Sequence, residues 1–407
     1  MTNCQVDCPG HFGHIRLPLP VFHPVVFDHM YEILLGTCTS CEDFHADPRA
    51  LACVTFQLRA LNAGVDAAGV ERLGAMFNDH VTAKKDKISS IEELETLYEA
   101  TVGDDDGGKR PAASDIHRNR KIEPLRSRLH RAFVTEHFRK RGKKCKNCGQ
   151  PMLKLINELK NKILLRKVHA TRKEERPTAA KRRKKKPTVN FSNDAADDDE
   201  EDDLEMEKEK ASVDKDDKLF VGQNKLLTPQ RARTILRRLW ELHSEMLTLM
   251  YPCLSGTAFQ QPVDIFLLES LAVPPVRFRP LNVVSGRKME NPQSLNLIEV
   301  LKESRLVEEK LAAMKTLDLA PTDDVDDKDN DKDNDKDING EPTSKRHARD
   351  EEVMFSLYTH WTQMQQNVNA VYDSALDKRT ATPRPGVKQI LEKKTGLFRM
   401  NLMGKCG

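Results

Sequence analysis

Two short cysteine turns, Cys38-Thr39-Ser40-Cys41 and Cys145-Lys146-Asn147-Cys148-Gly149, contain the residues that decide how this chain folds. A two-residue spacer lets both thiolates of one turn point at the same tetrahedral ion, and two such turns complete a closed site of four sulfurs. Gly149 suits a backbone turn that exposes amides to the sulfurs. Because four thiolates leave no open position for water, the spacing predicts a structural zinc held by Cys38, Cys41, Cys145 and Cys148.

Two other interpretations of these cysteines stay open from spacing alone. The pairs are separated by 103 residues, so they could be two unrelated cysteine pairs. A redox dithiol is less favoured, because no βαβ pattern surrounds either pair. The chain has nine cysteines, an odd number, and its N-terminus does not resemble an export signal. This usage favours a reducing compartment and metal thiolates over disulfides.

A second candidate metal turn lies at the N-terminus, in Cys8-Pro9-Gly10-His11. It offers one thiolate and one imidazole, and a complete site needs two further ligands. Cys4 lies near, but its spacing from Cys8 differs from that of a two-residue turn. On spacing alone, Cys8 and His11 are either half of a metal site or a coincidental cluster.

The 407 residues are 38% hydrophobic and 32% charged, against typical values of about 45–50% and about 25%. Such an excess of charge predicts folded parts separated by solvated segments. The net charge is +22 over 109–186, −11 over 194–217 and −7 over 323–341. A basic block of that size indicates a polyanionic partner, most often nucleic acid, with a disordered polyampholyte as the alternative. No apolar run reaches the ~18–20 residues that span a bilayer, so we expect no membrane partner.

Hydrophobic periodicity predicts a mainly α fold with small β elements. An apolar, strand-like run at 265–273 is closed by Pro274-Pro275, and Thr228-Pro229 forms a good helix start. Low complexity predicts two disordered insertions, at 170–217 and 322–345. The predicted helical segments are 27–35, 61–100, 125–167, 228–252, 294–317 and 351–376.

Several motifs, in order along the chain, resemble the largest subunit of multisubunit RNA polymerases. They are Cys8-Pro9-Gly10-His11-Phe12-Gly13-His14-Ile15 with Val21-Phe22-His23-Pro24, Val273-Pro274-Pro275-Val276-Arg277-Phe278-Arg279-Pro280, Val368-Asn369 with Asp373, Pro385-Gly386-Val387-Lys388-Gln389, and Gly396-Leu397-Phe398-Arg399 continuing to Met403-Gly404-Lys405. The Arg-Phe-Arg-Pro variant is closest to the eukaryotic RNA polymerase I form.

The resemblance implies a zinc-stapled polymerase clamp head and part of the clamp core. The implied organisation is a zinc-binding clamp head at 1–169, a disordered insertion at 170–217, clamp core with a lid region at 218–321, a disordered acidic insertion at 322–345, and a clamp core helix, rudder and start of the switch region at 346–407. Within these parts the lid loop is expected near 282–295 and the rudder near 374–387.

The resemblance also implies roles for individual residues. Cys38, Cys41, Cys145 and Cys148 would bind one clamp zinc, in agreement with the spacing, and Cys8 and His11 would be half of another site. Lys393, Lys394, Arg399 and Lys405 would lie near template-strand phosphates. The family's aspartate motif that holds catalytic magnesium is absent, and Cys406-Gly407 replaces the arginine that follows Gly404-Lys405 in the family. We therefore expect a fragment without catalytic residues of its own.

The function implied is that of a DNA-directed RNA polymerase I clamp, which holds DNA and the RNA–DNA hybrid during transcription of ribosomal RNA genes. Its partners would be the second-largest subunit and the other polymerase subunits, in the nucleus and nucleolus. One alternative is a free-standing, zinc-stabilised nucleic-acid-binding protein without catalysis. A third interpretation is a charged nuclear scaffold whose cysteines bind no metal.

Overall fold

A computed structural model describes the chain over these residues: 8, 10–83, 92, 94–96, 98–100, 122–167, 220–221, 224–255, 260–284, 286–318, 343–379, 381, 383–392 and 396–402. All of them belong to one compact unit. The predicted insertion at 170–217, most of the one at 322–345, and Lys393, Lys394 and Lys405 lie outside the described residues. Among the described helices, none combines the length and apolarity needed to cross a membrane.

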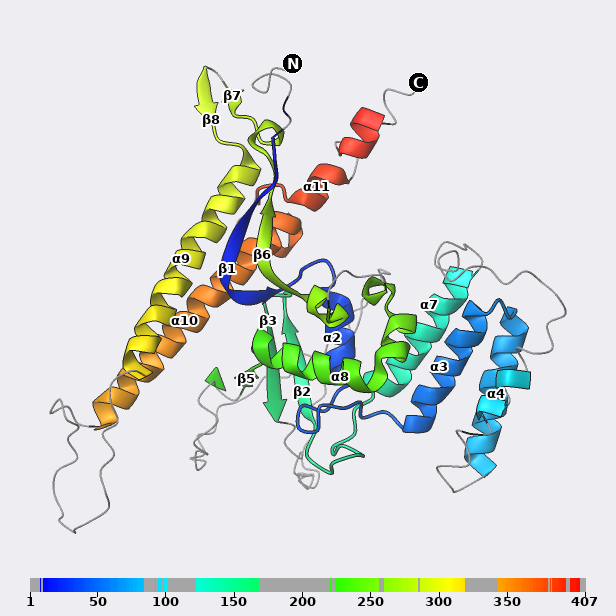
Figure 1. Cartoon of the computed structure of the whole chain (residues 1–407). Coiled ribbons are helices and arrows are strands. Elements are labelled where there is room, and N and C mark those ends of the chain that lie inside the picture. The colour runs from blue at the N-terminus through cyan, green and yellow to red at the C-terminus, as the bar shows by residue number, and fades with distance from the viewer. Residues whose placement is uncertain are drawn as a thin grey trace, which may run out of the picture. The chain divides into compact units, whose positions relative to one another are not determined.

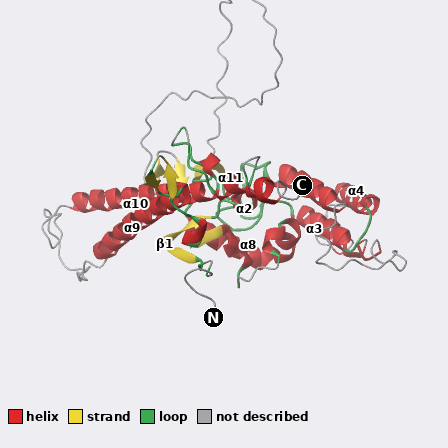
Figure 2. Ribbon diagram, turned by 90° about the horizontal axis from the view of Figure 1, so that it is seen from above, coloured by secondary structure: helices red, strands yellow, loops and turns green. Residues whose placement is uncertain are grey.

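Most of the described chain is helical, with small sheets, as the periodicity predicts (Figures 1 and 2). The α-helices are α2 (Phe27–Leu35), α3 (Pro48–Asn62), α4 (Ala67–Ala83), α7 (Ile122–Phe133), α8 (Pro229–Met250), α9 (Pro292–Asp318), α10 (Thr343–Tyr372) and α11 (Val387–Leu391). The strands are β1 (Gly13–Phe22), β2 (Leu153–Glu158), β3 (Lys162–Lys167), β4 (Phe220–Val221), β5 (Asn224–Leu226), β6 (Leu267–Val273), β7 (Asn282–Val284) and β8 (Arg287–Met289). Short π or 3-10 turns lie at Val134–Phe138, Pro252–Leu254, Pro262–Phe266, Val276–Phe278, Ser374–Leu376 and Phe398–Leu402.

The strand predicted at 265–273 is β6, and it pairs antiparallel with β1. The register breaks between Arg16 and Val21, where Pro18 and Pro20 lie. Proline has no N–H to donate to a ladder, so pairing stops there and resumes where Val21 lies opposite Leu268. The ribbon formed by β1 and β6 therefore joins the N-terminal segment to the middle of the chain.

Helices α9 and α10 lie side by side and antiparallel (Figure 1), and α10 also contacts β1. Trp361 of α10 is buried, and its indole N–H donates to the carbonyl of Pro20 at 3.1 Å. Its ring meets that of Phe22 edge to face, with centroids 6.0 Å apart. Phe22 in turn meets Phe27 of α2 at 5.8 Å. These aromatic contacts extend one core from α10 through β1 to α2.

Helix α8 packs against α3 and β1 and confirms the predicted helix start. The Thr228 side chain accepts a hydrogen bond from the amide of Arg231 at 3.3 Å, and Pro229 takes the first helical position. Of the apolar residues at helical spacing along α8, Ile235 and Leu239 are buried, whereas Leu242 is 45% exposed. The helix is kinked at His243, whose φ of −136° is non-helical.

The sequence predicts a helix throughout the basic stretch 125–167, and that prediction is wrong beyond Phe138. Residues 153–167 form instead the antiparallel β2–β3 hairpin, to which β5 and β4 add. The apolar residues Leu153 and Leu155 alternate with Lys154, which is a strand period and not a helical one. The turn places Leu159 and Lys160 at positive φ, 53° and 59°.

Two further boundaries differ from the sequence predictions. The loop expected near 282–295 is mostly the β7–β8 hairpin, turned at Gly286 with φ 76°, and α9 already begins at Pro292. Asn291 caps α9, because its side chain accepts the amide of Gln293 at 2.9 Å. Helix α10 begins at Thr343, earlier than the start predicted at Glu351 and inside the end of the predicted 322–345 insertion.

Candidate metal centre

The two cysteine turns have the same backbone geometry. Each is closed by a β-bridge, between Thr37 and Phe44 and between Lys144 and Pro151. In both, the amide of the first cysteine donates to the carbonyl five residues later, at 2.9 and 2.8 Å. The carbonyl of that cysteine accepts the amide four residues later, at 2.9 and 3.0 Å. The two segments are therefore local copies of one turn that presents its cysteines to one side.

The residue after the second cysteine of each turn adopts a left-handed backbone. This residue is Gly149, with φ 73°, in one turn and Glu42, with φ 58°, in the other. Glycine takes this conformation without strain, whereas glutamate does so at a cost. The Glu42 carboxylate forms an ion pair with Arg231 of α8, and Arg231 also donates to the carbonyl of Thr39 at 3.0 Å. Helix α8 thus holds the first turn in place.

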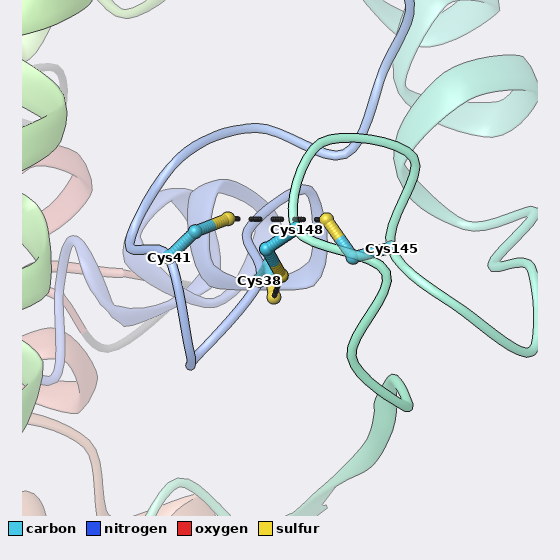
Figure 3. Close-up of side chains that lie close together, drawn as sticks. All are labelled: Cys38, Cys41, Cys145 and Cys148. Carbon is cyan, nitrogen blue, oxygen red and sulfur yellow. Dashed lines mark hydrogen bonds between the residues drawn. The ribbon is translucent and has the colours of Figure 1, made fainter.

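The four sulfurs converge from the two turns, as Figure 3 shows. The sulfurs of Cys38 and Cys148 are 3.7 Å apart, those of Cys41 and Cys145 are 3.8 Å apart, and all four lie within 4.8 Å of one another. These distances exceed a disulfide bond of about 2.05 Å. A tetrahedral zinc with Zn–S bonds of about 2.3 Å places its sulfurs about 3.8 Å apart. The donor set therefore fits a closed four-thiolate zinc site, and the alternative of two unrelated cysteine pairs is wrong.

The protein environment prepares one of these thiols for deprotonation. Burial opposes the charged form of Cys38, but backbone amides of Cys41 and Ser40 and neighbouring thiols lower its pKa to about 7. Burial and the other thiols raise the pKa of Cys41 to about 12, and burial raises that of Cys145. Four thiolates cannot be crowded together without a cation, so zinc binding would release the remaining protons.

Aromatic side chains pack behind the two turns. Phe44, in the first turn, stacks on Phe138 with ring centroids 5.0 Å apart. Phe138 ends the π-helical turn that precedes the second cysteine pair. A β-carbon at Gly36 would lie 2.5 Å from the Phe138 ring, so only glycine fits there. His243, at the kink of α8, contacts Asp43 through its Nε2 at 2.7 Å. These contacts link the first cysteine turn to the π-helical turn and to α8.

A model of the family described as RNA polymerase Rpb1, domain 1, matches residues 2–320. The chain belongs to the Rpb1 domain 1 family. Both cysteine turns lie within the matched segment.

This Rpb1-family chain is also similar to curated relatives along nearly its whole length. It is 26% identical to the DNA-directed RNA polymerase I subunit rpa1 of Schizosaccharomyces pombe over 99% of this chain and 25% of that protein. It is 24% identical to DNA-directed RNA polymerase I subunit RPA1 of Drosophila melanogaster, over 98% of this chain and 21% of that protein. It is 25% identical to DNA-directed RNA polymerase I subunit RPA190 of Saccharomyces cerevisiae, over 99% of this chain and 25% of that protein. The chain spans about a quarter of the length of these relatives, and the resemblance to the polymerase I form is confirmed.

The other predicted ligands of the Rpb1-family chain, Cys8 and His11, are exposed. The amide of Gly10 approaches the Cys8 sulfur at 3.4 Å, and Arg277 donates to the Cys8 carbonyl at 3.3 Å. Within the part of the chain that the structure describes, the four cysteines are the only group of three or more potential ligands. Cys4 lies outside that part, so a second metal site stays a prediction.

Of the four predicted DNA-binding residues, the structure describes Arg399 alone, exposed in the turn Phe398–Leu402.

Earlier in the chain, contacts between Asp373 and Gln389 join two of the motifs that resemble the family. The Gln389 side-chain amide donates to the Asp373 carboxylate at 2.6 Å and accepts the amides of Ser374 and Gly386 at 3.0 and 3.2 Å. Lys388 donates to the same carboxylate at 2.8 Å. These bonds close the loop between α10 and α11.

This loop is expected to loosen in acid. Burial opposes ionisation of Asp373, but hydrogen bonds from Lys388 and Gln389 lower its pKa below the ordinary value. A lowered native pKa stabilises the fold above the unfolded value of about 3.9, and the contribution disappears as pH falls below it. Hydrogen exchange at residues 374–376 should therefore be slower in the native chain than in Asp373→Asn at pH 7. Equal protection at pH 7 would contradict this role, and the difference should shrink below about pH 4.

A half-buried arginine, Arg141, supports the metal centre, although the sequence analysis did not single it out. Arg141 lies in the segment between the π-helical turn and the second cysteine pair. Its guanidinium donates to the carbonyls of Leu35, Leu34 and Thr37 at 2.8, 3.0 and 2.9 Å, and also to that of Leu153. Burial lowers its pKa to about 10, so the group stays charged at neutral pH. Arg141 thus ties the end of α2 and the first cysteine turn to β2.

Replacing Arg141 by lysine should destabilise the chain by about 2–4 kcal/mol. Lysine has three donors on a single nitrogen and cannot reach four carbonyls, which would leave buried acceptors unsatisfied. The midpoint of thermal unfolding, followed by circular dichroism, checks this. The matched control is Arg139→Lys, because Arg139 is exposed two residues away. Equal midpoints for the two variants would contradict the role given to Arg141.

Proposed function

We propose that this chain forms the clamp of an RNA polymerase I largest subunit, which grips DNA and the RNA–DNA hybrid while ribosomal RNA genes are transcribed. The observation that carries the proposal is the four-cysteine centre, whose two halves lie 110 and 104 positions apart and meet at 3.7 and 3.8 Å. It lies within a chain similar to polymerase I subunits over 98–99% of its length. The protein would work in the nucleus, and in the nucleolus within it.

The zinc would act as a structural element. The ion would supply only a tetrahedral crosslink, with Cys38, Cys41, Cys145 and Cys148 as its ligands. The crosslink would hold α2 and its following turn against the β2–β3 hairpin. Cys8 and His11 would supply half of a second zinc site. We assign no catalytic residue to this chain, and nucleotidyl transfer at magnesium would belong to the aspartate motif that its sequence lacks.

The other parts of the chain would take the clamp, lid and rudder roles that membership of the family implies. The clamp head would be 1–169, and the clamp core would be 218–321 together with 346–407. In the core, the β7–β8 hairpin would be the lid that separates RNA from template. Its Val283 and Met289 are 67% and 55% exposed, available for contact with nucleic acid. The loop closed by Asp373 and Gln389 would be the rudder, and Arg399 with Lys393, Lys394 and Lys405 would lie near template phosphates.

Purification of the tagged protein from its own cells tests this function. The second-largest RNA polymerase subunit should copurify with it, and chromatin immunoprecipitation should recover ribosomal RNA genes. The variant Cys145→Ser should lose both, because its clamp cannot hold its shape. A zinc-containing protein that binds nucleic acid and brings down no polymerase subunit would instead establish the free-standing binding protein.

A further inference from the structure

Three titratable side chains meet inside the molecule, and none of them is a predicted metal ligand. They come from three elements: Glu32 from α2, His130 from α7, and Tyr251 from the residue that follows α8. The Nε2 atom of His130 lies 3.6 Å from Oε2 of Glu32. The rings of His130 and Tyr251 meet edge to face, with centroids 5.1 Å apart. We call these three residues the α2–α7 cluster.

The α2–α7 cluster encloses polar atoms without satisfying them. Among the residues that the structure describes, Oε2 of Glu32, Nε2 of His130 and the hydroxyl of Tyr251 are buried and have no hydrogen-bond partner. The 3.6 Å between Glu32 and His130 is too long for a hydrogen bond. Buried polar atoms are nearly always paired, and an exception points to a strained or functional position. The cluster is therefore costly for the fold, and a small change in charge can open it.

The surroundings of His130 oppose a positive charge on its ring. Arg126 lies one helical turn away on the same side of α7, and its side chain is 11% exposed. Burial, followed by the charges of His29, Arg126 and Arg131, lowers the pKa of His130 from 6.5 to about 4. His130 is therefore neutral at neutral pH while α7 lies against α2.

Glu32 is the acid of the cluster. Burial raises its pKa, Arg139 lowers it, and Asp28 raises it. Burial raises the pKa of Tyr251 well above its ordinary value, and the charge of Glu32 adds to that effect, so the hydroxyl keeps its proton. The other titratable groups near the cluster, which surround His29, are Asp28, Lys160 and Cys253. No other group of the described chain that acts on His130 favours its charged form.

Helix α7 has a separate, apolar contact on another side. Leu125 and Leu129 pack against the core cluster of Ala60, Leu61 and Val70, which belong to α3 and α4. Apolar contacts of this kind do not change with pH. At its end α7 continues into the π-helical turn Val134–Phe138, where Phe138 stacks on Phe44. Helix α7 can therefore move away from α2 while these other contacts remain.

We propose that the α2–α7 cluster is a pH-sensitive latch, which holds α7 against α2 at neutral pH and releases it when His130 gains a proton. In the closed cluster, a protonated imidazole would be a second cation beside Arg126. Once α7 moves away from α2, water can solvate that charge. The movement would pivot at the π-helical turn. The latch goes beyond the proposed function and does not depend on it.

The sign of the pH dependence follows from the two titrating groups. The open state binds a proton on His130 more tightly than the closed state, so the closed state loses stability as pH falls from 6.5 towards about 4. The raised pKa of Glu32 acts in the opposite sense, because the closed state then holds the carboxyl proton more tightly. Arg139 weakens that opposing effect, so His130 dominates.

The test is hydrogen exchange of the zinc-loaded full chain, followed by mass spectrometry between pH 7 and pH 5 and corrected for the intrinsic exchange rate. Residues 125–133 of α7 should lose protection by about tenfold over this range, because His130 gains a proton on opening. Residues 357–368 of α10 should keep their protection, which separates opening of the latch from unfolding of the whole chain.

Two variants identify the group that titrates. His130→Gln should have the same α7 protection at both pH values, because its amide cannot gain a proton. Glu32→Gln removes the opposing acid and should lose at least as much protection as the native chain. The matched control is His360→Gln, since His360 is also half-buried and its ring contacts Glu303 at 3.0 Å. This control should keep the pH dependence of the native chain.

Several results would overturn the inference. They are an unchanged α7 protection in the native chain, an equal loss in His130→Gln, and a parallel loss in α7 and α10. A second measurement uses the native chain alone and so does not depend on how a variant folds. Hydrogen exchange at the imidazole C2 position follows the titration of each histidine, and that of His130 should have its midpoint below 6.5. A midpoint at or above that value would show that the closed cluster does not exclude the proton.

Discussion

Replacing Cys145 by serine should remove one zinc ion per chain and destabilise the fold by about 5 kcal/mol or more. Structural zinc contributes about 10–16 kcal/mol of binding free energy in small zinc domains, and that energy is coupled to folding. Cys145 is 3% exposed, so its loss would leave three converging thiols in a buried site without a complete ligand set. Zinc stoichiometry by mass spectrometry and the thermal unfolding midpoint measure the two effects. At about 2–4 °C per kcal/mol, the midpoint should fall by at least about 10 °C.

The matched control for this prediction is Cys253→Ala. Cys253 is half-buried and lies outside the cluster, with its sulfur 3.7 Å from His29. This variant should keep its zinc and lose little stability. Titration of the native chain with a chelator should reproduce the Cys145→Ser midpoint. Full zinc retention in Cys145→Ser would show that the four sulfurs do not form the metal site.

The cysteine centre could be predicted from the sequence because its signal is local. A two-residue spacer fixes the geometry of each turn by itself, and a tetrahedral ion needs two such turns. The spacing could not predict the fold that brings the two turns together across more than 100 residues of sequence. That closure depends on Gly36 making room for Phe138 and on Arg141 joining three segments. Nothing in the sequence distinguishes Arg141 from the basic residues on either side of it.

The β2–β3 hairpin was missed for a related reason. Hairpin turns are usually marked by glycine or asparagine at positions of positive φ. Here Leu159 and Lys160 take those positions, and the asparagines Asn157 and Asn161 lie on either side of them. Because this region is strongly basic, its sequence resembles that of a solvent-exposed helix, and a helix was predicted. Tertiary pairing with β5 overrides these local preferences.

A buried polar network accounts for one motif that the sequence could only recognise by resemblance, Val368-Asn369. Asn369 is fully buried and donates to the carbonyl of Lys160 and the side-chain oxygen of Asn161, at 3.1 and 2.8 Å. It also accepts a hydrogen bond from Gln365 at 2.9 Å. Gln365 in turn bonds both backbone groups of Phe22. Helix α10 therefore fixes the end of β1 and the β2–β3 turn through two side chains.

Replacing Gln365 by alanine should destabilise the chain by about 3–5 kcal/mol. Gln365 has no exposed surface, and it satisfies the amide of Phe22 at 2.7 Å and the carbonyl of Phe22 at 2.9 Å. Each buried group left without a partner costs about 1–3 kcal/mol, and the truncated side chain adds a cavity. The thermal unfolding midpoint should fall by about 10 °C. The neighbouring half-buried Gln366 provides the control, and Gln366→Ala should shift the midpoint by much less.

The variant Gln365→Glu separates lost hydrogen bonding from lost volume, since it keeps the size of the side chain. A carboxylate can still accept the Phe22 amide, but it would face the carbonyl of Phe22 and the oxygen of Asn369 with no proton to donate. Burial and these oxygens should raise the pKa of the introduced carboxyl group above its unfolded value of about 4.3. The defect should then be largest at pH 7 and should decrease as pH falls through the raised pKa, because the protonated acid can donate again. A defect that is independent of pH, or equal midpoints for Gln365→Ala and Gln366→Ala, would show that the network does not hold β1 on α10.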